Sequence, residues 1–259
     1  MRIPFALVPY LIEKYSLGGT GGAILLNIVG VILCILIPYL LGSLNFGIIV
    51  SRALFKEDVR DYGSGNSGST NILRSYGIKA AVLTFLGDFL KGALSVVIGM
   101  LILQTSVETT GGFVLRPIGG WIASFFVVFG HMFPVYFHFR GGKGIASAAG
   151  TIAVTSPLTL GILVLIFLVI VVGTKYVSLG SVMAALIYPF LISRLDRPVG
   201  INVIMALMTG LFIIFMHRDN IKRLWEGTES KVSFRNKGAR EQAAKTDTKK
   251  AGREKNDEK

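Results

Sequence analysis

A chain of 259 residues in which 52% are hydrophobic and only 16% are charged is too apolar for a water-soluble protein of one or two domains. The net charge of +12 does not indicate a nucleic-acid partner, because the basic residues are not interleaved with aromatic ones on a folded polar domain. The single cysteine, Cys34, excludes an intrachain disulfide and a cysteine metal site, and the sequence contains no HxxD or HExxH motif. We therefore expect a polytopic membrane protein, and we assign it no metal and no cofactor.

Residues 1–23 form an N-terminal extension that is weakly amphipathic and rich in glycine near its end. It is either an interfacial helix or an irregular segment. No cleavage site of small residues follows an apolar core within residues 1–15, so we expect no removed signal peptide.

Long apolar runs then recur up to residue 217. A helix needs about 20 residues to cross a membrane, and the runs of roughly that length or more are 24–55, 79–104, 118–139, 158–174, 177–195 and 200–217. Pro38 and Gly42 offer places where the first run can bend. Residues 145–156 would give about 18 Å of helix, too short for a hydrocarbon core of about 30 Å. The pattern predicts an all-α membrane bundle of about seven helices, one of them short.

The C-terminal part of the chain changes character after this bundle. We take 24–217 as the transmembrane domain, 218–234 as a cytoplasmic C-terminal motif and 235–259 as a charged tail. The tail holds no aromatic residue and cannot bury enough surface to fold, so we expect it to be disordered.

Positive charge alternates between the connections. The first connection carries five Lys or Arg residues, the third carries Arg140 and Lys143, and the fifth carries Lys175. The second connection carries Arg116 alone, although the sixth, with two arginines, weakens the alternation. By the positive-inside rule the N-terminus lies outside and the C-terminus in the cytoplasm. The polar glycine-bearing loops then all lie on the cytoplasmic face.

The first of these loops covers residues 63–74 and reads GSGNSGSTNILR. Its glycines, hydroxyls and amides lie between two apolar runs, so its backbone N–H groups and Arg74 can converge on an anion beside the membrane. Such composition is also typical of a flexible linker, but a linker does not need two asparagines and a terminal arginine. We interpret the loop as a phosphate cradle.

A second polar segment, residues 130–144, reads GHMFPVYFHFRGGKG. No Ser or Thr follows Lys143 and the GxxxxGK[ST] spacing is absent, so a nucleotide-binding P-loop is not expected. A bare backbone turn with a fixed cation suits a small phosphate ester. The alternative is a hairpin with a snorkelling lysine. That alternative does not explain His131, which is costly inside a span and needs a partner.

Two further segments carry polar groups, and the second span carries a charged pair. Ser178 and Ser181 lie on one helix face, where they bind a ligand or only mediate helix packing. Residues 217–229 contain His217, Asn220 and Glu229, and an alternative interpretation is a basic interfacial helix. Asp88 and Lys91, three residues apart within a predicted span, are expected to form a buried structural pair.

Together these segments resemble the bacterial acyl-phosphate:glycerol-3-phosphate acyltransferase family, the PlsY type. The family motifs read GSGNPGATNxLR, GHxxPVFxxFKGGKG, SLxS and HxxNIxRLxxGTE, and residues 63–74, 130–144, 178–181 and 217–229 match them in order. The departures are Ser67 for proline, Ser69 for alanine, Tyr136 for phenylalanine and Arg140 for lysine. The resemblance covers about residues 36–234.

The resemblance implies transfer of a fatty acyl group from acyl phosphate to the 1-hydroxyl of glycerol 3-phosphate, beside membrane lipid. It implies catalytic roles for Ser64, Arg74, Lys143, Ser181 and His217. It implies substrate binding or its support by Gly65, Asn66, Gly68, Thr70, Asn71, His131, Gly141, Gly142, Gly144, Ser178, Asn220, Gly227 and Glu229. A peripheral enzyme that supplies acyl phosphate is a further partner that the sequence leaves open.

Direct attack on the acyl carbonyl is the mechanism we favour, because acyl phosphate is already activated and no side chain is an obvious nucleophile. The leaving phosphate or His217 takes the proton. Two other classes stay open from the residues alone: a phosphate-ester transporter and a structural membrane subunit. No inverted repeat of the transporter kind is visible.

Overall fold

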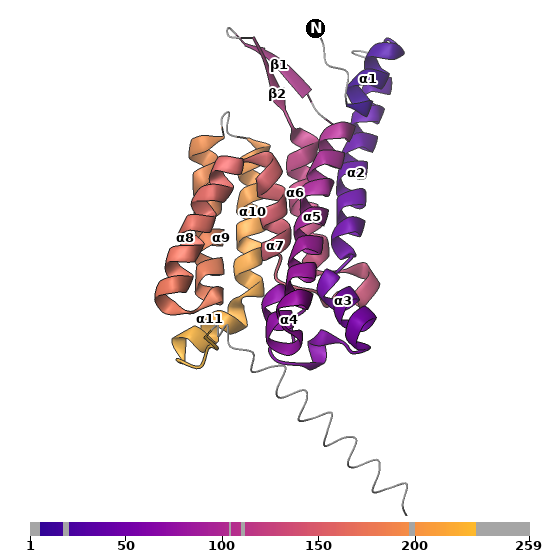
Figure 1. The fold of residues 1–259 in the computed structure, drawn as a ribbon. Helices are drawn as coiled ribbons and strands as arrows, with labels where there is room; N and C mark the ends of the chain where they lie inside the picture. The colour runs from indigo at the N-terminus through magenta and orange to yellow at the C-terminus, as the bar shows by residue number, and fades with distance from the viewer. Residues whose placement is uncertain (1–5, 18–20, 104, 110–111, 197–199, 232–259) are drawn as a thin grey trace, which may run out of the picture.

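The computed structural model describes residues 6–17, 21–103, 105–109, 112–196 and 200–231. Its long helices run side by side along one common direction (Figure 1). The helix α1 (Leu7–Lys14) and a β-hairpin lie at one end, and the short helices α3 (Phe46–Phe55), α4 (Ser69–Tyr76) and α11 (Arg218–Trp225) lie at the other. The chain is therefore a bundle with two differently built ends.

Among the described residues, seven helices make up the body of the bundle, as the apolar runs predicted. They are α2 (Gly21–Ser43), α5 (Ile78–Ile102), α6 (Ile118–Met132), α7 (Ile145–Thr155), α8 (Pro157–Thr174), α9 (Val177–Leu195) and α10 (Ile201–Met216). Five candidate spans in the described residues are long and apolar enough to cross a membrane, and α10 with α11, bent by 55°, could make a sixth. As expected, α7 is short.

The outer faces of the bundle are apolar. On α8 the side chains of Leu165, Val169 and Val172 are 63–65% exposed. A continuous apolar surface of this kind is unfavourable in water but favourable in contact with lipid tails. The protein is thus a multi-pass membrane protein, with α6 at its centre, packed against α2, α5, α7 and α10.

Helix packing inside the bundle depends on glycines that let two backbones approach closely. A Cβ built on Gly99 of α5 would overlap the carbonyl oxygen of Gly119 on α6, and a Cβ on Gly119 would overlap the Gly99 carbonyl. Small residues at such crossings are the usual means of close packing between membrane helices.

The predicted first span is interrupted at a place that the sequence analysis did not anticipate. Pro38 and Gly42 both lie within α2, and the helix ends only at Ser43. A new helix, α3, starts after Asn45, whose side chain accepts a hydrogen bond from Ile48 N at 3.4 Å. The break is stabilised from α5, where Lys91 Nζ donates to the carbonyl of Leu44 at 2.8 Å.

The predicted second and third spans were both too long. α5 ends at Ile102, and strands β1 (Thr105–Thr109) and β2 (Gly112–Arg116) follow as an antiparallel hairpin with Val107 opposite Val114. α6 ends at Met132, and Val135–Phe137 is a short 3-10 turn, η2. The all-α bundle therefore carries a small β-hairpin outside it.

Parts of the extension predicted for residues 1–23 are described. Leu7–Lys14 forms a helix, whose place at the membrane interface stays a prediction, and Val8 is buried in a cluster with Cys34 and Leu103. The tail at 235–259, expected to be disordered, lies outside the described residues.

Candidate active site

The segments with polar motifs meet at one end of the bundle. The loop before α4, the loop between α6 and α7, the start of α9 and helix α11 all lie at the end opposite the β-hairpin (Figure 1). This arrangement follows from the up-and-down course of the helices: each of these segments follows or precedes a helix end on the same side. Residues separated by more than 150 positions are thereby placed together.

Asn71 holds the first loop in shape. Its Nδ2 lies 2.8–3.2 Å from the carbonyls of Val59, Tyr62 and Asn66, and its Oδ1 accepts a hydrogen bond from Ser64 N at 3.0 Å. A Cβ at Gly63, which has a φ of +59°, would overlap that same Oδ1. The amide of Asn71 thus shapes the loop from within.

Asn66 has a similar part in the loop. Its Oδ1 accepts from Gly68 N at 2.9 Å, just before α4 begins at Ser69. The backbone N–H groups of Ser64 and Gly68 are therefore engaged by side chains of the loop itself. Ser64 and Gly65 are both exposed, and Gly65 has a φ of +67°. Thr70 lies in the first turn of α4.

The Gly-Gly-Lys-Gly turn folds back against the end of α6. Gly141 N donates to the carbonyl of Met132 and Gly142 N to the carbonyl of His131, both at 3.1 Å. A Cβ at Gly141 would overlap the His131 carbonyl, and one at Gly142 would overlap the His131 ring. Gly144 then precedes α7 with a φ of +84°. The glycines are needed for this close return of the chain.

Lys143 is the cation that this turn presents. Its Nζ donates a hydrogen bond to Asn220 Oδ1 on α11. Burial, together with the positive charges of Arg223 and Arg74, lowers the pKa of Lys143 to about 8, against the opposite effect of Glu229 and Asp219. Arg74 Nη2 donates to the carbonyl of Ser230, shortly after α11, so Arg74 and Lys143 lie at the same end of the molecule.

Glu229 joins two of the predicted residues, Ser178 and Asn220, to Arg223. Its Oε1 accepts from Ser178 Oγ and Asn220 Nδ2, and its Oε2 accepts from Arg223 Nε, each at 2.7 Å. Burial alone would raise the pKa of this carboxyl group, but the hydrogen bonds from Asn220, Ser178 and Arg223 outweigh burial and keep the pKa below its usual value. The carboxylate is therefore charged and ties α11 to the start of α9.

The turn after α11 returns Glu229 to that position. Gly227 has a φ of +70°, and Thr228 N and Glu229 N both donate to the carbonyl of Arg223, at 2.8 and 3.1 Å. A left-handed glycine directly after a helix is the common way to reverse the chain there. The next residue, Ser230, accepts a hydrogen bond from Arg74 Nη2 at 3.2 Å.

His217 and Ser181 lie beside this cluster. His217, at the junction of α10 and α11, is buried, and its Nδ1 lies 2.8 Å from the carbonyl oxygen of Ile213. Ser181 Oγ donates to the carbonyl of Val177 one turn back on α9. We refer to Arg74, Lys143, Ser178, Asn220, Arg223 and Glu229 as the Lys143 cluster.

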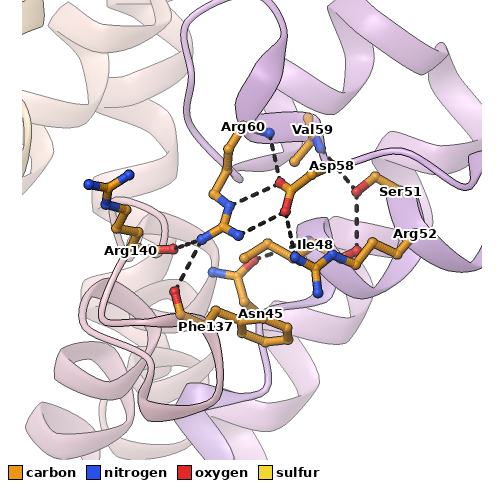
Figure 2. A network of polar contacts seen from close by, with 9 residues as sticks. All are labelled: Asn45, Ile48, Ser51, Arg52, Asp58, Val59, Arg60, Phe137 and Arg140. Atoms are coloured by element: carbon orange, nitrogen blue, oxygen red, sulfur yellow. Dashed lines mark hydrogen bonds and ion pairs between the residues drawn. The ribbon is translucent and has the colours of Figure 1, made fainter.

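A second network joins the segment just before the first loop to the second motif, and the sequence analysis missed it (Figure 2). Arg60 Nη1 donates to the carbonyls of Phe137 at 3.2 Å and Arg140 at 2.9 Å, while Nε and Nη2 bind the Asp58 carboxylate at 2.9 and 2.8 Å. The Arg60 guanidinium holds the pKa of Asp58 well below its usual range. The only sequence signal for this network was the position of Arg60, a positive charge three residues before the glycine-rich loop that begins at Gly63.

Beside this network lies a cavity of about 670 Å³. Its lining comes from both loops: Asp58, Arg60, Asp61, Gly65, His138, Arg140 and Gly141. The Arg60 network therefore links the segment before the first loop to the segment that leads into the Gly-Gly-Lys-Gly turn.

Comparison with known proteins identifies the family to which the chain belongs. The family model of glycerol-3-phosphate acyltransferases matches residues 32–227. The chain belongs to the glycerol-3-phosphate acyltransferase family. It is 43% identical over 195 residues to the glycerol-3-phosphate acyltransferase of Syntrophomonas wolfei subsp. wolfei, a match covering 75% of this chain and 93% of that protein. It is 38% identical over 210 residues to the same enzyme of Finegoldia magna, covering 80% and 98%.

Solved structures agree with the sequence relatives. The chain is similar to crystal structures of PlsY, described as an integral membrane glycerol 3-phosphate acyltransferase, in two forms. Its TM-score is 0.68 to the glycerol 3-phosphate form, with 34% identity over 78% of this chain and 96% of that one. Its TM-score is 0.66 to the lysophosphatidic acid form, with 33% identity over 80% and 97%. The predicted family and the membrane fold are confirmed, and the transporter and structural-subunit alternatives give way to an acyltransferase.

Proposed function

We propose that this protein moves a fatty acyl group from acyl phosphate to the 1-hydroxyl of glycerol 3-phosphate, which yields 1-acylglycerol 3-phosphate and inorganic phosphate, the first step of bacterial phospholipid synthesis. The observation that carries the proposal is the Lys143 cluster, in which cations gather at the polar end of an apolar bundle. Such a site suits two anionic reactants when one of them has a lipid tail. The glycerol 3-phosphate and lysophosphatidic acid forms of the solved relatives support the same acceptor and product.

We assign the first loop to the acyl-phosphate head. In this proposal the head lies against Ser64, Gly65, Asn66 and Gly68, while the side chains of Asn66 and Asn71 hold the loop in shape. The first N–H groups of a helix lack partners within the helix, so Thr70 at the start of α4 adds to the attraction for an anion.

Arg74, Lys143, Ser181 and His217 hold the phosphates and the glycerol hydroxyls in this proposal. Gly141, Gly142 and Gly144 let the backbone approach the ligand, and Ser178, Asn220, Gly227 and Glu229 keep Lys143 and α11 in place. The Arg223 side chain belongs with this supporting set, although the sequence analysis did not single it out.

The chemical step is a direct acyl transfer. The 1-oxygen of glycerol 3-phosphate attacks the acyl carbonyl carbon, an ester bond forms, the bond between that carbon and the phosphate oxygen breaks, and phosphate leaves. The hydroxyl proton goes to the leaving phosphate or to His217. Holding two anions together and offsetting their repulsion supplies most of the acceleration.

The site lies at the cytoplasmic face of the bacterial inner membrane in this proposal. The motif-bearing end carries Arg52, Lys56, Arg60, Lys79 and Lys175 besides the cluster, which is the charge pattern of a cytoplasmic end. Glycerol 3-phosphate then arrives from the cytoplasm, and a peripheral enzyme can supply acyl phosphate at the same surface.

The deciding experiment offers purified protein three donors: palmitoyl phosphate, palmitoyl-CoA and palmitoyl acyl carrier protein. We expect phosphate release from palmitoyl phosphate only when glycerol 3-phosphate is present, with equal amounts of lysophosphatidate formed. Product from palmitoyl-CoA or the carrier protein alone would refute the donor assignment. Mass spectrometry that traps an acyl group on Ser64 or Ser181 would refute direct transfer.

A further inference from the structure

A buried charged cluster lies behind the active-site loops, within the bundle. Asp88 and Lys91, on one face of α5, form an ion pair of 2.6 Å and are 1% and 4% exposed at their side chains. His131 on α6 is 3% exposed, and its Nδ1 lies 3.0 Å from Lys91 Nζ and 3.3 Å from Asp88 Oδ1. Charged groups in a membrane bundle are costly and persist where each has a partner.

Each member of the cluster also contacts a segment near the active site. Lys91 Nζ donates to the carbonyl of Leu44 at 2.8 Å, and Asp88 Oδ1 accepts from Phe46 N at 3.4 Å, so the pair satisfies the backbone where α2 gives way to α3. Asn45, between them, donates from Nδ2 to the His131 carbonyl at 3.4 Å. The broken first span and the end of α6 are thereby joined.

The His131 ring, whose Nδ1 faces Lys91 and Asp88, packs with its opposite edge against the Gly-Gly-Lys-Gly turn. The three atoms nearest to a Cβ built on Gly142 are Nε2, Cε1 and Cδ2 of His131. The Gly142 backbone has no positive φ, so the ring itself is what excludes a side chain there. Gly142 N bonds to the carbonyl of the same histidine, and Lys143 is the next residue.

We propose that Asp88, Lys91 and His131 form a positioning unit for acyl transfer. The ion pair fixes the His131 ring, the ring sets the place of Gly142, and Gly142 sets where Lys143 presents its ammonium group to the glycerol 3-phosphate phosphate. His131 is then a positioning residue and not a substrate ligand. The inference rests on the proposed function, because its readout is the affinity for glycerol 3-phosphate.

A double-mutant cycle between His131 and Gly142 tests the contact. Gly142→Ala should raise KM for glycerol 3-phosphate about tenfold or more, because the new methyl group displaces the turn. In the His131→Ala background the same change should cost about threefold or less, since the obstructing ring is gone. KM for palmitoyl phosphate should change less than KM for glycerol 3-phosphate in Gly142→Ala.

Gly141→Ala is the matched control. Its Cβ would overlap the His131 carbonyl, a backbone atom that remains after His131→Ala. Its defect should therefore be the same in both backgrounds. If the KM defect of Gly142→Ala, like that of Gly141→Ala, is the same with and without the His131 ring, the proposal is overturned.

Two further measurements keep the test decisive. If His131→Ala does not fold, His131→Asn replaces it, because the amide can reach Lys91 but is too short to meet a methyl group at position 142. The wild-type protein is assayed first with palmitoyl phosphate and glycerol 3-phosphate. An inactive wild type contradicts the proposed function, whereas an active wild type with an additive cycle contradicts only the positioning unit.

Discussion

Lys143 and Asn220 are 77 positions apart in the chain, yet the ammonium group of one donates a hydrogen bond to the amide oxygen of the other. This contact joins the turn after α6 to helix α11 after α10. Asn220 in turn donates to Glu229, which holds Ser178 and Arg223. The only cation on the Gly-Gly-Lys-Gly turn is thus held by a chain of hydrogen bonds through two other motifs.

The pH dependence of substrate binding should report the ionisation of Lys143. Its pKa is lowered from 10.5 to about 8, so the ammonium is protonated below that pH and loses its proton as the pH rises through it. We expect kcat/KM for glycerol 3-phosphate to fall about tenfold per pH unit above about pH 8, because kcat/KM follows groups of the free enzyme.

Lys143→Arg is the control for this profile. Arginine keeps its charge over the whole accessible range. The variant should be slower at neutral pH, because the planar guanidinium group cannot reproduce the hydrogen bond of Lys143 Nζ to Asn220 Oδ1. Its kcat/KM should not fall near pH 8. A fall at the same pH in Lys143→Arg would assign the titration to another group.

Removing the charge of Glu229 should loosen α11. Glu229→Gln replaces one of the two acceptor oxygens with an NH2 group, which then faces donors: either Arg223, or Ser178 and Asn220. A buried donor left without an acceptor costs about 1–3 kcal/mol. We expect a lower melting temperature in detergent together with a higher KM for glycerol 3-phosphate. Glu226→Gln, at an exposed position paired with Lys222, should leave both unchanged.

The sign of the acid effect follows from the same carboxylate. Because the folded-state pKa of Glu229 is below its ordinary value of 4.5, the ionised form stabilises the fold above that pH. This stabilisation is lost as the pH falls through the folded-state pKa. The difference in melting temperature between wild type and Glu229→Gln should therefore shrink below about pH 4.5, and a constant difference would contradict the role of the charge.

The helices of the bundle were predictable from the sequence because each is a long apolar run of nearly the right length. The convergence of residues 63–74, 130–144, 178–181 and 217–229 was predictable from charge in the connections and from the family motifs. The break at Leu44 and Asn45 was not, because Lys91 and Asp88, more than 40 positions away, stabilise it. The hairpin at 105–116 is too short to leave a clear periodic signal.

Individual roles within the motifs were harder to predict than their position. Asn66 and Asn71 were expected at the substrate, and the structure directs their amides to the loop backbone. Arg60 lies outside every motif and gained notice only as a positive charge, yet it bonds to the backbone of the second loop. Side-chain partners between distant loops depend on tertiary packing that local patterns do not encode.

Arg60 should be needed for the spacing of the two substrate loops. Arg60→Lys keeps the charge but loses the planar fork that reaches Asp58 and two carbonyls at once. We expect a loss of about 1–3 kcal/mol in the free energy of unfolding and a higher KM for both substrates, measured with purified protein. Arg52→Lys is the control, since Arg52 makes one hydrogen bond to the same carboxylate and its side chain is 54% exposed. An equal loss of stability in both variants would contradict the role of Arg60 in linking the two loops.

Close packing of α5 against α7 should be sensitive to a single methyl group. A Cβ at Gly150 of α7 would overlap the carbonyl oxygen of Phe89 on α5, so Gly150→Ala must push the helices apart and should cost about 1–3 kcal/mol of stability. Gly161→Ala in α8 is the matched control, because nothing lies within 4 Å of its added Cβ and alanine is the better helix former. Melting temperatures in the same detergent should drop for Gly150→Ala and stay level or rise for Gly161→Ala. Because α5 carries Asp88 and Lys91, displacement of α5 should also raise KM for glycerol 3-phosphate in Gly150→Ala, and an unchanged melting temperature there would show that the two helices are not packed backbone to backbone.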